Sequence, residues 1–252
     1  MILSSGTHKP KIHSSVYVAP TATIAGGVTI GEGCAVLHGA VITAEGAPIT
    51  IGAKTVIMEH AVLKASGGSA TTFALSVGDR CIVGPHAYVV GAEIGSGCFV
   101  ASGAKIFNGA TLEDGSGVAL GGIVHVKTRL GAGATVPMLH IAAGDPATIY
   151  PPEKAGQIRE QIAFFADVFN LEASDHVRAR AAEAYAKFLR KTHAQDAQLD
   201  AHRNVRPPQR RSGEEPPATQ STEVDKVVDV MMLELEEMEH RRQQAIKRQR
   251  GG

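Results

Sequence analysis

The sequence predicts a mainly β protein in which a parallel β-helix is followed by C-terminal α-helices. Three observations predict this fold. Aliphatic residues recur at every sixth position through the first 150 residues, glycine is abundant with 28 residues, and aromatic residues make up only 4% of the chain with no Trp. A core of Val, Ile, Ala and Gly without large rings must consist of thin repeated layers, and stacked coils of short strands provide such layers.

Each six-residue unit contains one aliphatic residue and, four positions later, one small residue. We expect each unit to form a short strand and a tight turn, and three units to form one triangular coil, with coils about 4.8 Å apart. Both residues would point inward, the small one where the walls converge. A glycine often follows the aliphatic residue, where we expect backbone angles that a Cβ would forbid. The aliphatic positions are Val18, Ile24, Ile30, Val36, Ile42, Ile51, Ile57, Leu63, Val77, Val83, Val89, Ile94, Val100, Ile106, Leu112, Val118, Val124, Leu130 and Val136.

The cysteines indicate how the coils are aligned. Cys34, Cys81 and Cys98 occupy the small-residue position of one wall, and Thr55 occupies the same position between them. We interpret this column as buried packing rather than a redox or metal site, because thiolates require polar access. Three cysteines also cannot pair completely, which argues against a secreted disulfide framework.

Composition excludes several classes of protein. Apolar residues make up 44% of the chain, so a packed core is expected, and 25 basic residues balance 25 acidic ones. This balance argues against nucleic acid or an anionic membrane as a partner. No apolar run reaches the ~20 residues that cross a bilayer, and the N-terminus lacks a signal-peptide pattern. We therefore expect a cytoplasmic protein.

The repeat defines a first domain over residues 12–150, interrupted by two loops. The segment Thr43–Pro48 adds three residues, and Ala65–Ala74 makes a longer excursion rich in Gly, Ser and Thr. Loops that protrude from a solenoid commonly carry its function.

Residues 151–202 predict two helices that pack along the β-helix or cap its end. The first opens at Glu153, and Ser174 is the expected N-cap of the second. Helical spacing predicts which side chains of the two helices face inward: Ile158, Ile162, Phe165, Phe169, Val177, Ala181, Tyr185 and Phe188.

Proline and charge predict a disordered linker over residues 203–222, followed by an amphipathic helix over 223–250. In that helix Val228, Met231, Leu235 and Met238 keep a three-four spacing. So short a stripe is compatible with pairing to a partner or to another copy, and equally with a solvated helix.

Several segments carry a resemblance to a known family. Residues 12–150 resemble the γ-class carbonic anhydrases, which are left-handed parallel β-helices of the hexapeptide-repeat transferase superfamily. The resemblance is carried by the break at Ala92-Glu93 and by Val36–Ile42, Pro48–Gly52, Ile94–Val100 and Ala143–Ala147. Gly27–Ala65 is also similar to the non-catalytic small dynactin subunits of this fold. The family resemblance implies a homotrimer.

The resemblance implies a zinc site at the subunit boundary, held by three histidines. At the corresponding positions this chain has Lys64, Pro85 and Val90. Tetrahedral zinc requires ligand atoms that these side chains lack. The supporting residues also differ, since Thr43 and Glu45 stand in place of an Arg and an Asp. We therefore predict that the family's zinc chemistry is lost and that no cofactor is bound.

Two other histidines fall at equivalent positions of adjacent coils. His60 and His86 each come three residues after an aliphatic position, so we expect them to stack. With Glu59 and Lys64 nearby they could form a catalytic pair or a relocated metal site, to which His38 could contribute. Chance alignment of two exposed turn residues is the alternative.

These observations leave four functions open. The first is a metal-free trimeric scaffold or binding protein, with the C-terminal helix recruiting partners. The second is an acyltransferase that takes acyl-CoA and uses His60, supported by Glu59, or His86 as general base. The third is a carbonic anhydrase with a relocated zinc. The fourth is a binder of small anions that uses Lys64 and His86, with Glu45 beside them.

Overall fold

The architecture is that of a computed structural model, which describes residues 1–65, 72–160 and 164–199. The chain divides into two compact units, Met1–Val205 and Arg206–Gly252, and every described residue belongs to the first. The expected linker over 203–222 and helix over 223–250 lie outside the described residues, as do Ile162 and most of the excursion that follows Ala65.

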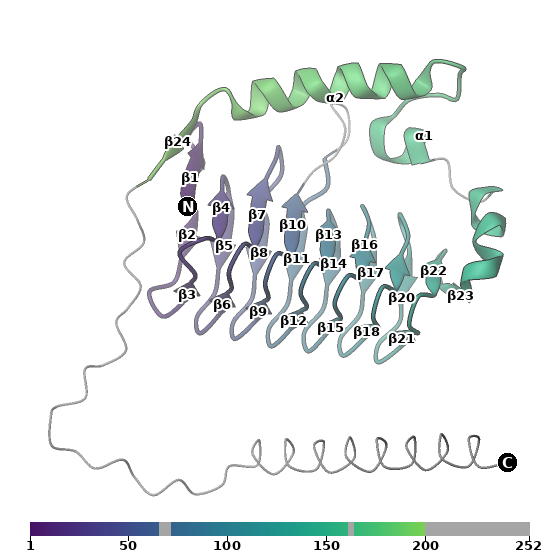
Figure 1. Cartoon of the computed structure of the whole chain (residues 1–252), viewed down its shortest axis with the longest axis horizontal. Coiled ribbons are helices and arrows are strands. Elements are labelled where there is room, and N and C mark those ends of the chain that lie inside the picture. Colours follow the sequence, from purple (N-terminus) through teal and green to yellow (C-terminus); the bar gives the residue numbers. More distant parts are fainter. Residues whose placement is uncertain (66–71, 161–163, 200–252) are drawn as a thin grey trace, which may run out of the picture. The chain divides into compact units, whose positions relative to one another are not determined.

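The first unit is a left-handed parallel β-helix whose three walls are three sheets (Figure 1). From β1 to β22, successive strands of the chain fall in different sheets, and each pairs in parallel with the strand three places along the chain. Strands β23 and β24 instead pair antiparallel at the two ends of sheet A. Sheet A contains β1 (Ile2–Ser5), β4 (Thr23–Ala25), β7 (Val41–Ala44), β10 (Val62–Ala65), β13 (Tyr88–Val90), β16 (Lys105–Ile106), β19 (Ile123–Val124), β22 (Ile141–Ala143), β23 (Thr148–Tyr150) and β24 (Asp196–Gln198).

The other two walls contain seven strands each. Sheet B contains β2 (Lys11–Ile12), β5 (Val28–Ile30), β8 (Ile49–Ile51), β11 (Leu75–Val77), β14 (Glu93–Ile94), β17 (Thr111–Leu112) and β20 (Arg129–Leu130). Sheet C contains β3 (Tyr17–Val18), β6 (Ala35–Val36), β9 (Val56–Ile57), β12 (Ile82–Val83), β15 (Phe99–Val100), β18 (Gly117–Val118) and β21 (Thr135–Val136).

The core confirms the six-residue repeat. All nineteen predicted aliphatic positions are buried, the most accessible being Val18 at 6%. The predicted column also forms, because Cys34, Thr55, Cys81 and Cys98 are at most 2% exposed. Their side chains bond to polar groups of neighbouring coils, as Thr55 does in donating to the carbonyl of Gly78 at 2.8 Å. Burial raises the pKa of the Cys34 thiol, which fits a packing role.

Glycine follows the aliphatic residues for a different reason than the backbone angles expected from the sequence. Gly31, Gly52, Gly78 and Gly95 do not have a positive φ. A Cβ on Gly78 would instead lie 2.6 Å from backbone atoms of the next coil. These glycines therefore permit close stacking of the coils, and the positive φ angles fall later in the turns.

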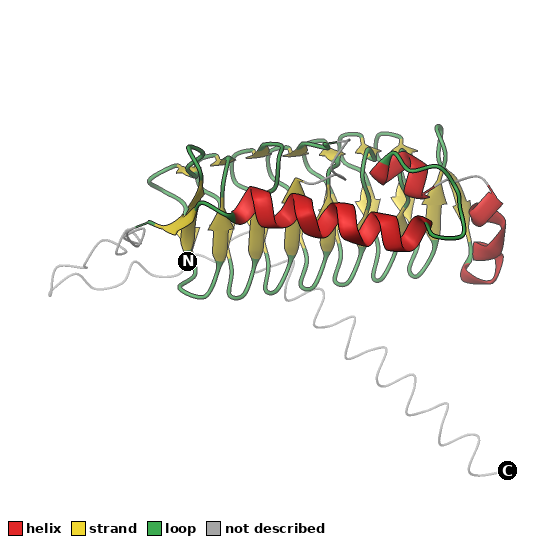
Figure 2. Cartoon of the chain, turned by 90° about the horizontal axis from the view of Figure 1, so that it is seen from above, coloured by secondary structure: helices red, strands yellow, loops and turns green. Residues whose placement is uncertain are grey.

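The helices follow the solenoid and return along sheet A. They are the 3-10 helix η1 (Pro152–Glu160), α1 (Phe164–Phe169) and α2 (Val177–His193). Figure 2 shows α2 running across the strands of sheet A, with α1 and η1 toward the last coils. The chain then forms β24, which pairs antiparallel with β1 and extends sheet A. Where two helices were expected, the described chain therefore has the three segments η1, α1 and α2, and Tyr185 of α2 bonds to Lys64 and Glu45 of the β-helix.

Two details of the structure differ from expectation, the N-cap of α2 and the two strands β1 and β24. Residue Ser174 does not cap α2, because the N-cap is His176 and it makes no side-chain capping bond. Neither β1 nor β24 was expected, since neither carries the six-residue pattern; both are held by pairing at the edge of an existing sheet.

Candidate functional site

Lys64 and Glu45 form a half-buried ion pair on the outer side of sheet A. Lys64 lies on β10, and Glu45 lies in the loop that follows β7, the first predicted interruption of the repeat. The Lys64 Nζ is 3.0 Å from the Glu45 Oε1, and the side chains are 21% and 6% exposed. The additional residues of this loop thus place a carboxylate beside the strand that carries the lysine.

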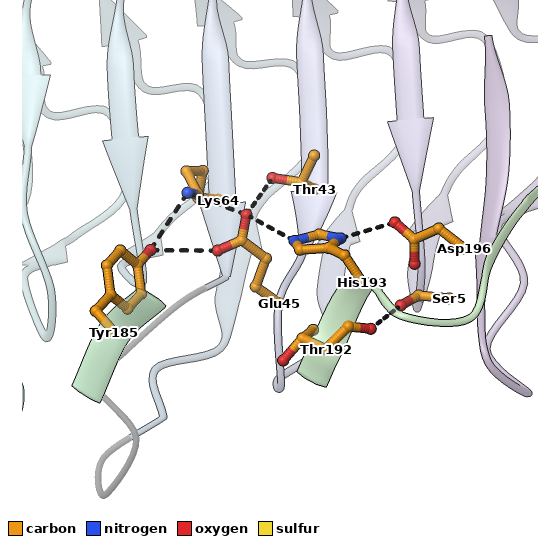
Figure 3. A network of polar contacts seen from close by, with 8 residues as sticks. All are labelled: Ser5, Thr43, Glu45, Lys64, Tyr185, Thr192, His193 and Asp196. Atoms are coloured by element: carbon orange, nitrogen blue, oxygen red, sulfur yellow. Dashed lines mark hydrogen bonds and ion pairs between the residues drawn. The ribbon is translucent and has the colours of Figure 1, made fainter. Parts of the chain in front are cut away.

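Helix α2 and strand β24 complete a polar network around Glu45 (Figure 3). The Tyr185 hydroxyl donates to the Glu45 Oε2 at 3.3 Å, and the Lys64 Nζ donates to that hydroxyl at 3.5 Å. The His193 Nε2 is 3.6 Å from the Glu45 Oε1, while its Nδ1 is 2.7 Å from the Asp196 Oδ2. The network therefore connects α2 to the sheet through one carboxylate.

The electrostatics keep Lys64 charged. Burial opposes its protonation, but the hydrogen bond and the charge of Glu45, together with Tyr185, outweigh that cost and raise the pKa of Lys64. An external anion at this point would have to displace Glu45 from the ammonium group. The geometry consequently does not favour the anion-binding alternative that pairs Lys64 with His86.

The three positions that the family resemblance assigns to zinc do not suit that metal. Lys64 is ion-paired, Val90 is buried beside it on β13 in register, and Pro85 lies in the turn between β12 and β13. None offers an imidazole, thiolate or carboxylate. Elsewhere in the described part of the chain, no three His, Cys, Asp or Glu side chains are grouped to hold a metal ion.

His60 and His86 stack as expected. Their ring centroids are 5.2 Å apart with an interplanar angle of 9°. Both are exposed, and both have a φ of 57° at equivalent turns between sheets C and A. The turn of His38 lies one coil earlier, where the His38 carbonyl accepts the His60 backbone N–H at 3.0 Å.

The stacked histidines and the Lys64 network are two separate groups. Among the described residues no hydrogen bond or ion pair joins them. Glu59 forms the first half of the His60 turn, and its carbonyl accepts the His86 backbone N–H at 3.0 Å. The contact of Glu59 with the pair is thus through its backbone.

The sequence reasoning missed the partners that α2 and β24 supply. Helical spacing places Tyr185 in an apolar stripe, and that stripe does not include His193 or Asp196. A signal for His193 was present, because it lies eight residues after Tyr185 and so close to the same helix face.

A row of exposed apolar side chains lies on sheet C and on its turn toward sheet A. On the sheet, Tyr17, Ile82 and Phe99 are 44%, 41% and 51% exposed. Strand pairing aligns them with Ala35 and Val56 in one continuous row. The later turns add three more exposed residues, Leu120, Met138 and Leu139. We call these eight residues the sheet C face.

Comparison with known proteins agrees with this fold. Residues 9–44 match the family "Bacterial transferase hexapeptide (six repeats)". The mitochondrial γ carbonic anhydrase 1 of Arabidopsis thaliana is 24% identical over 198 residues, covering 76% of this chain and 70% of that protein. An uncharacterized protein of Dictyostelium discoideum is 31% identical over 143 residues, which are 56% of each chain.

A solved hexapeptide transferase family protein from Anaplasma phagocytophilum covers 75% of this chain and 93% of its own, with 18% identity and a TM-score of 0.41. Within the described residues, no helix is both long and apolar enough to cross a bilayer. Six-residue periodicity, a three-walled β-helix and the similarity to the family model and the curated relatives agree with one another. The chain is a hexapeptide-repeat β-helix that is similar to the γ-class carbonic anhydrases over about three quarters of its length.

Proposed function

We propose that the protein is a metal-free, γ-carbonic-anhydrase-like scaffold or binding protein that acts as a trimer. The observation that carries this proposal is the ion pair between Lys64 and Glu45 at the first position where the family places a zinc ligand. A protonated amine repels a divalent cation, and Glu45 raises the pKa of Lys64 further. The position then serves to fix α2 to the β-helix rather than to bind metal.

The sheet C face supports assembly into a trimer. Large apolar side chains seldom form a contiguous exposed row on a monomer, and such rows mark contact surfaces. Helix α2 lies along sheet A, whereas Tyr17, Ile82 and Phe99 remain exposed on sheet C. Three copies related by a closed rotation would bury this face without leaving an open end.

Metal analysis of protein purified without chelators tests the loss of zinc chemistry. We expect well below one zinc per chain and no CO₂ hydration above the buffer rate. The triple variant K64H/P85H/V90H restores the three imidazoles at the assigned positions and should bind zinc if they converge. Stoichiometric zinc and hydratase activity in the unaltered protein would refute the proposal.

Light scattering tests assembly separately. The unaltered chain should have the mass of three copies, and Phe99→Asp should dissociate it because a buried charge without a partner is costly. The control Glu93→Gln changes an exposed residue of sheet B and should leave the mass unchanged. A monomer at micromolar concentration would contradict the trimer.

The stacked histidines favour a second candidate function, acyl transfer from acyl-CoA. Two exposed imidazoles held 5.2 Å apart on adjacent turns offer a general base for an acceptor hydroxyl or amine. Protection of the protein by acetyl-CoA in a thermal shift assay would favour this function. Turnover that survives the double variant H60A/H86A would exclude these residues as its base.

A further inference from the structure

A second region of sheet A lines an open cavity that none of the functions considered above uses. It has a volume of about 360 Å³ and lies between the last coils of sheet A and the segments η1 and α1. Apart from His125, its walls are apolar: Phe107, Ile123, Ile141, Ala155, Ile158 and Phe164. The volume is near the small end of the ~300–1,000 Å³ range of ligand pockets.

Among the described residues that line this cavity, His125 has the one polar side chain. Its Nδ1 accepts the backbone N–H of Val126 at 2.8 Å, which fixes the neutral tautomer with the proton on Nε2. The ring also packs on Phe107, with centroids 5.9 Å apart. No described residue provides an acceptor for the Nε2–H. A hydrogen-bond donor thus stands at the wall of an apolar space without a partner from the described chain.

The chemistry of the walls limits what can occupy this space. A carboxylate would lose its hydration without gaining a cation from the described chain, because no Lys or Arg is among the described residues that line the cavity. The nearby Lys127 is ion-paired with Asp167 at 2.6 Å. A hydrocarbon alone would leave the donor unsatisfied. An uncharged molecule with an apolar body and one carbonyl oxygen satisfies both requirements.

We propose that this cavity binds a medium-length acyl group as an uncharged amide, ester or thioester, with its carbonyl oxygen accepting the Nε2–H of His125. The hydrocarbon then lies against Ile123, Ile141 and Ile158, and Phe164 covers it from α1. The inference does not depend on the trimer or on the loss of zinc chemistry. Its failure would leave the proposed function untouched.

Calorimetric titration of the full-length chain tests the site, with octanamide as probe. We expect saturable binding of octanamide and at least about threefold weaker binding of octylammonium, which has the same chain but no acceptor. In histidine-selective NMR the His125 ring protons should shift on titration, while those of His60 and His140 should not.

Two variants and one control locate the ligand. His125→Phe keeps a ring against Phe107 but removes the donor, so octanamide should bind about 3- to 10-fold more weakly. Ala155→Leu fills the cavity and should weaken binding more than tenfold. His140→Phe changes a histidine that does not line the cavity and should leave the affinity unchanged.

Three results would overturn the proposal. They are no saturable binding of octanamide up to its solubility limit, equal affinity for octylammonium, and a shift of other histidines without a shift of His125. All three are measured on the unaltered chain, so a variant that fails to fold does not remove the test.

Discussion

Breaking the ion pair between Glu45 and Lys64 should destabilise the protein strongly, and removing both partners should not. Separating a buried pair by deleting one member costs about 3–5 kcal/mol. Lys64 retains 21% exposure, and Tyr185 still donates to the carboxylate. We therefore expect Lys64→Met to lower the free energy of unfolding by about 2–3 kcal/mol, and Glu45→Leu by about 2 kcal/mol. The double variant should lose only about 1–2 kcal/mol in total, because no charge is left unpaired.

The measurement is a double-mutant cycle by urea unfolding, followed by far-UV circular dichroism with unchanged m-values as a check. These expectations give a coupling of about 2–4 kcal/mol, at the upper end of the ~0.5–3 kcal/mol range for contacting residues or slightly above it. The pair Lys127–Asp167 is the matched control, since it also joins a helix to the β-helix but is 57% and 26% exposed. Its coupling should stay below about 1 kcal/mol. A coupling between Glu45 and Lys64 no larger than the control would refute the idea that this network fixes α2.

Three further predictions concern the coils, the cavity histidine and the thiols. Gly78→Ala should lower the free energy of unfolding by about 3 kcal/mol or more in thermal or urea unfolding, because its Cβ would lie 2.6 Å from the next coil. Gly131→Ala is the control, because a Cβ there meets open space and should be neutral or slightly stabilising. Equal effects of the two substitutions would contradict the close-stacking explanation. Burial lowers the pKa of His125 from 6.5, so its contribution to stability is present above that pH and is lost as the pH falls below it. His125→Phe should flatten the fall in unfolding free energy between about pH 7 and pH 5, and an unchanged slope would exclude His125 as its source. A thiol reagent should label the three buried cysteines slowly in the native protein and completely in guanidinium, and fast native labelling would contradict the buried column.

The repeat could be predicted because its information is local. Ile57 and Val83 are buried for the same reason, since each coil sets the same inward position in the next coil along the axis. The stacking of His60 on His86 followed from that register. The reason for glycine at Gly78 did not follow, because periodicity shows which residue recurs but not how closely two coils approach.

The helices were harder to predict in detail. Their apolar spacing indicated that they pack against the β-helix. The prediction that Ser174 caps α2 was wrong, because the N-cap is His176. Residue type alone marks a possible N-cap, and only the capping hydrogen bond identifies the actual one. Strand β24 has no alternating pattern of its own and exists through its pairing with β1.

The sequence by itself determined the coil, its inward column and the residues at the positions where relatives are expected to hold zinc. The tertiary structure decided what those residues do. Lys64 meets Tyr185 across 121 residues, and Tyr185 meets Glu45 across 140. Such contacts have no periodic signature, because they depend on where the returning helix lies against the finished sheet. Stacking repeats the same local geometry, whereas docking of α2 combines many weak side-chain contacts that exist only once both surfaces have formed.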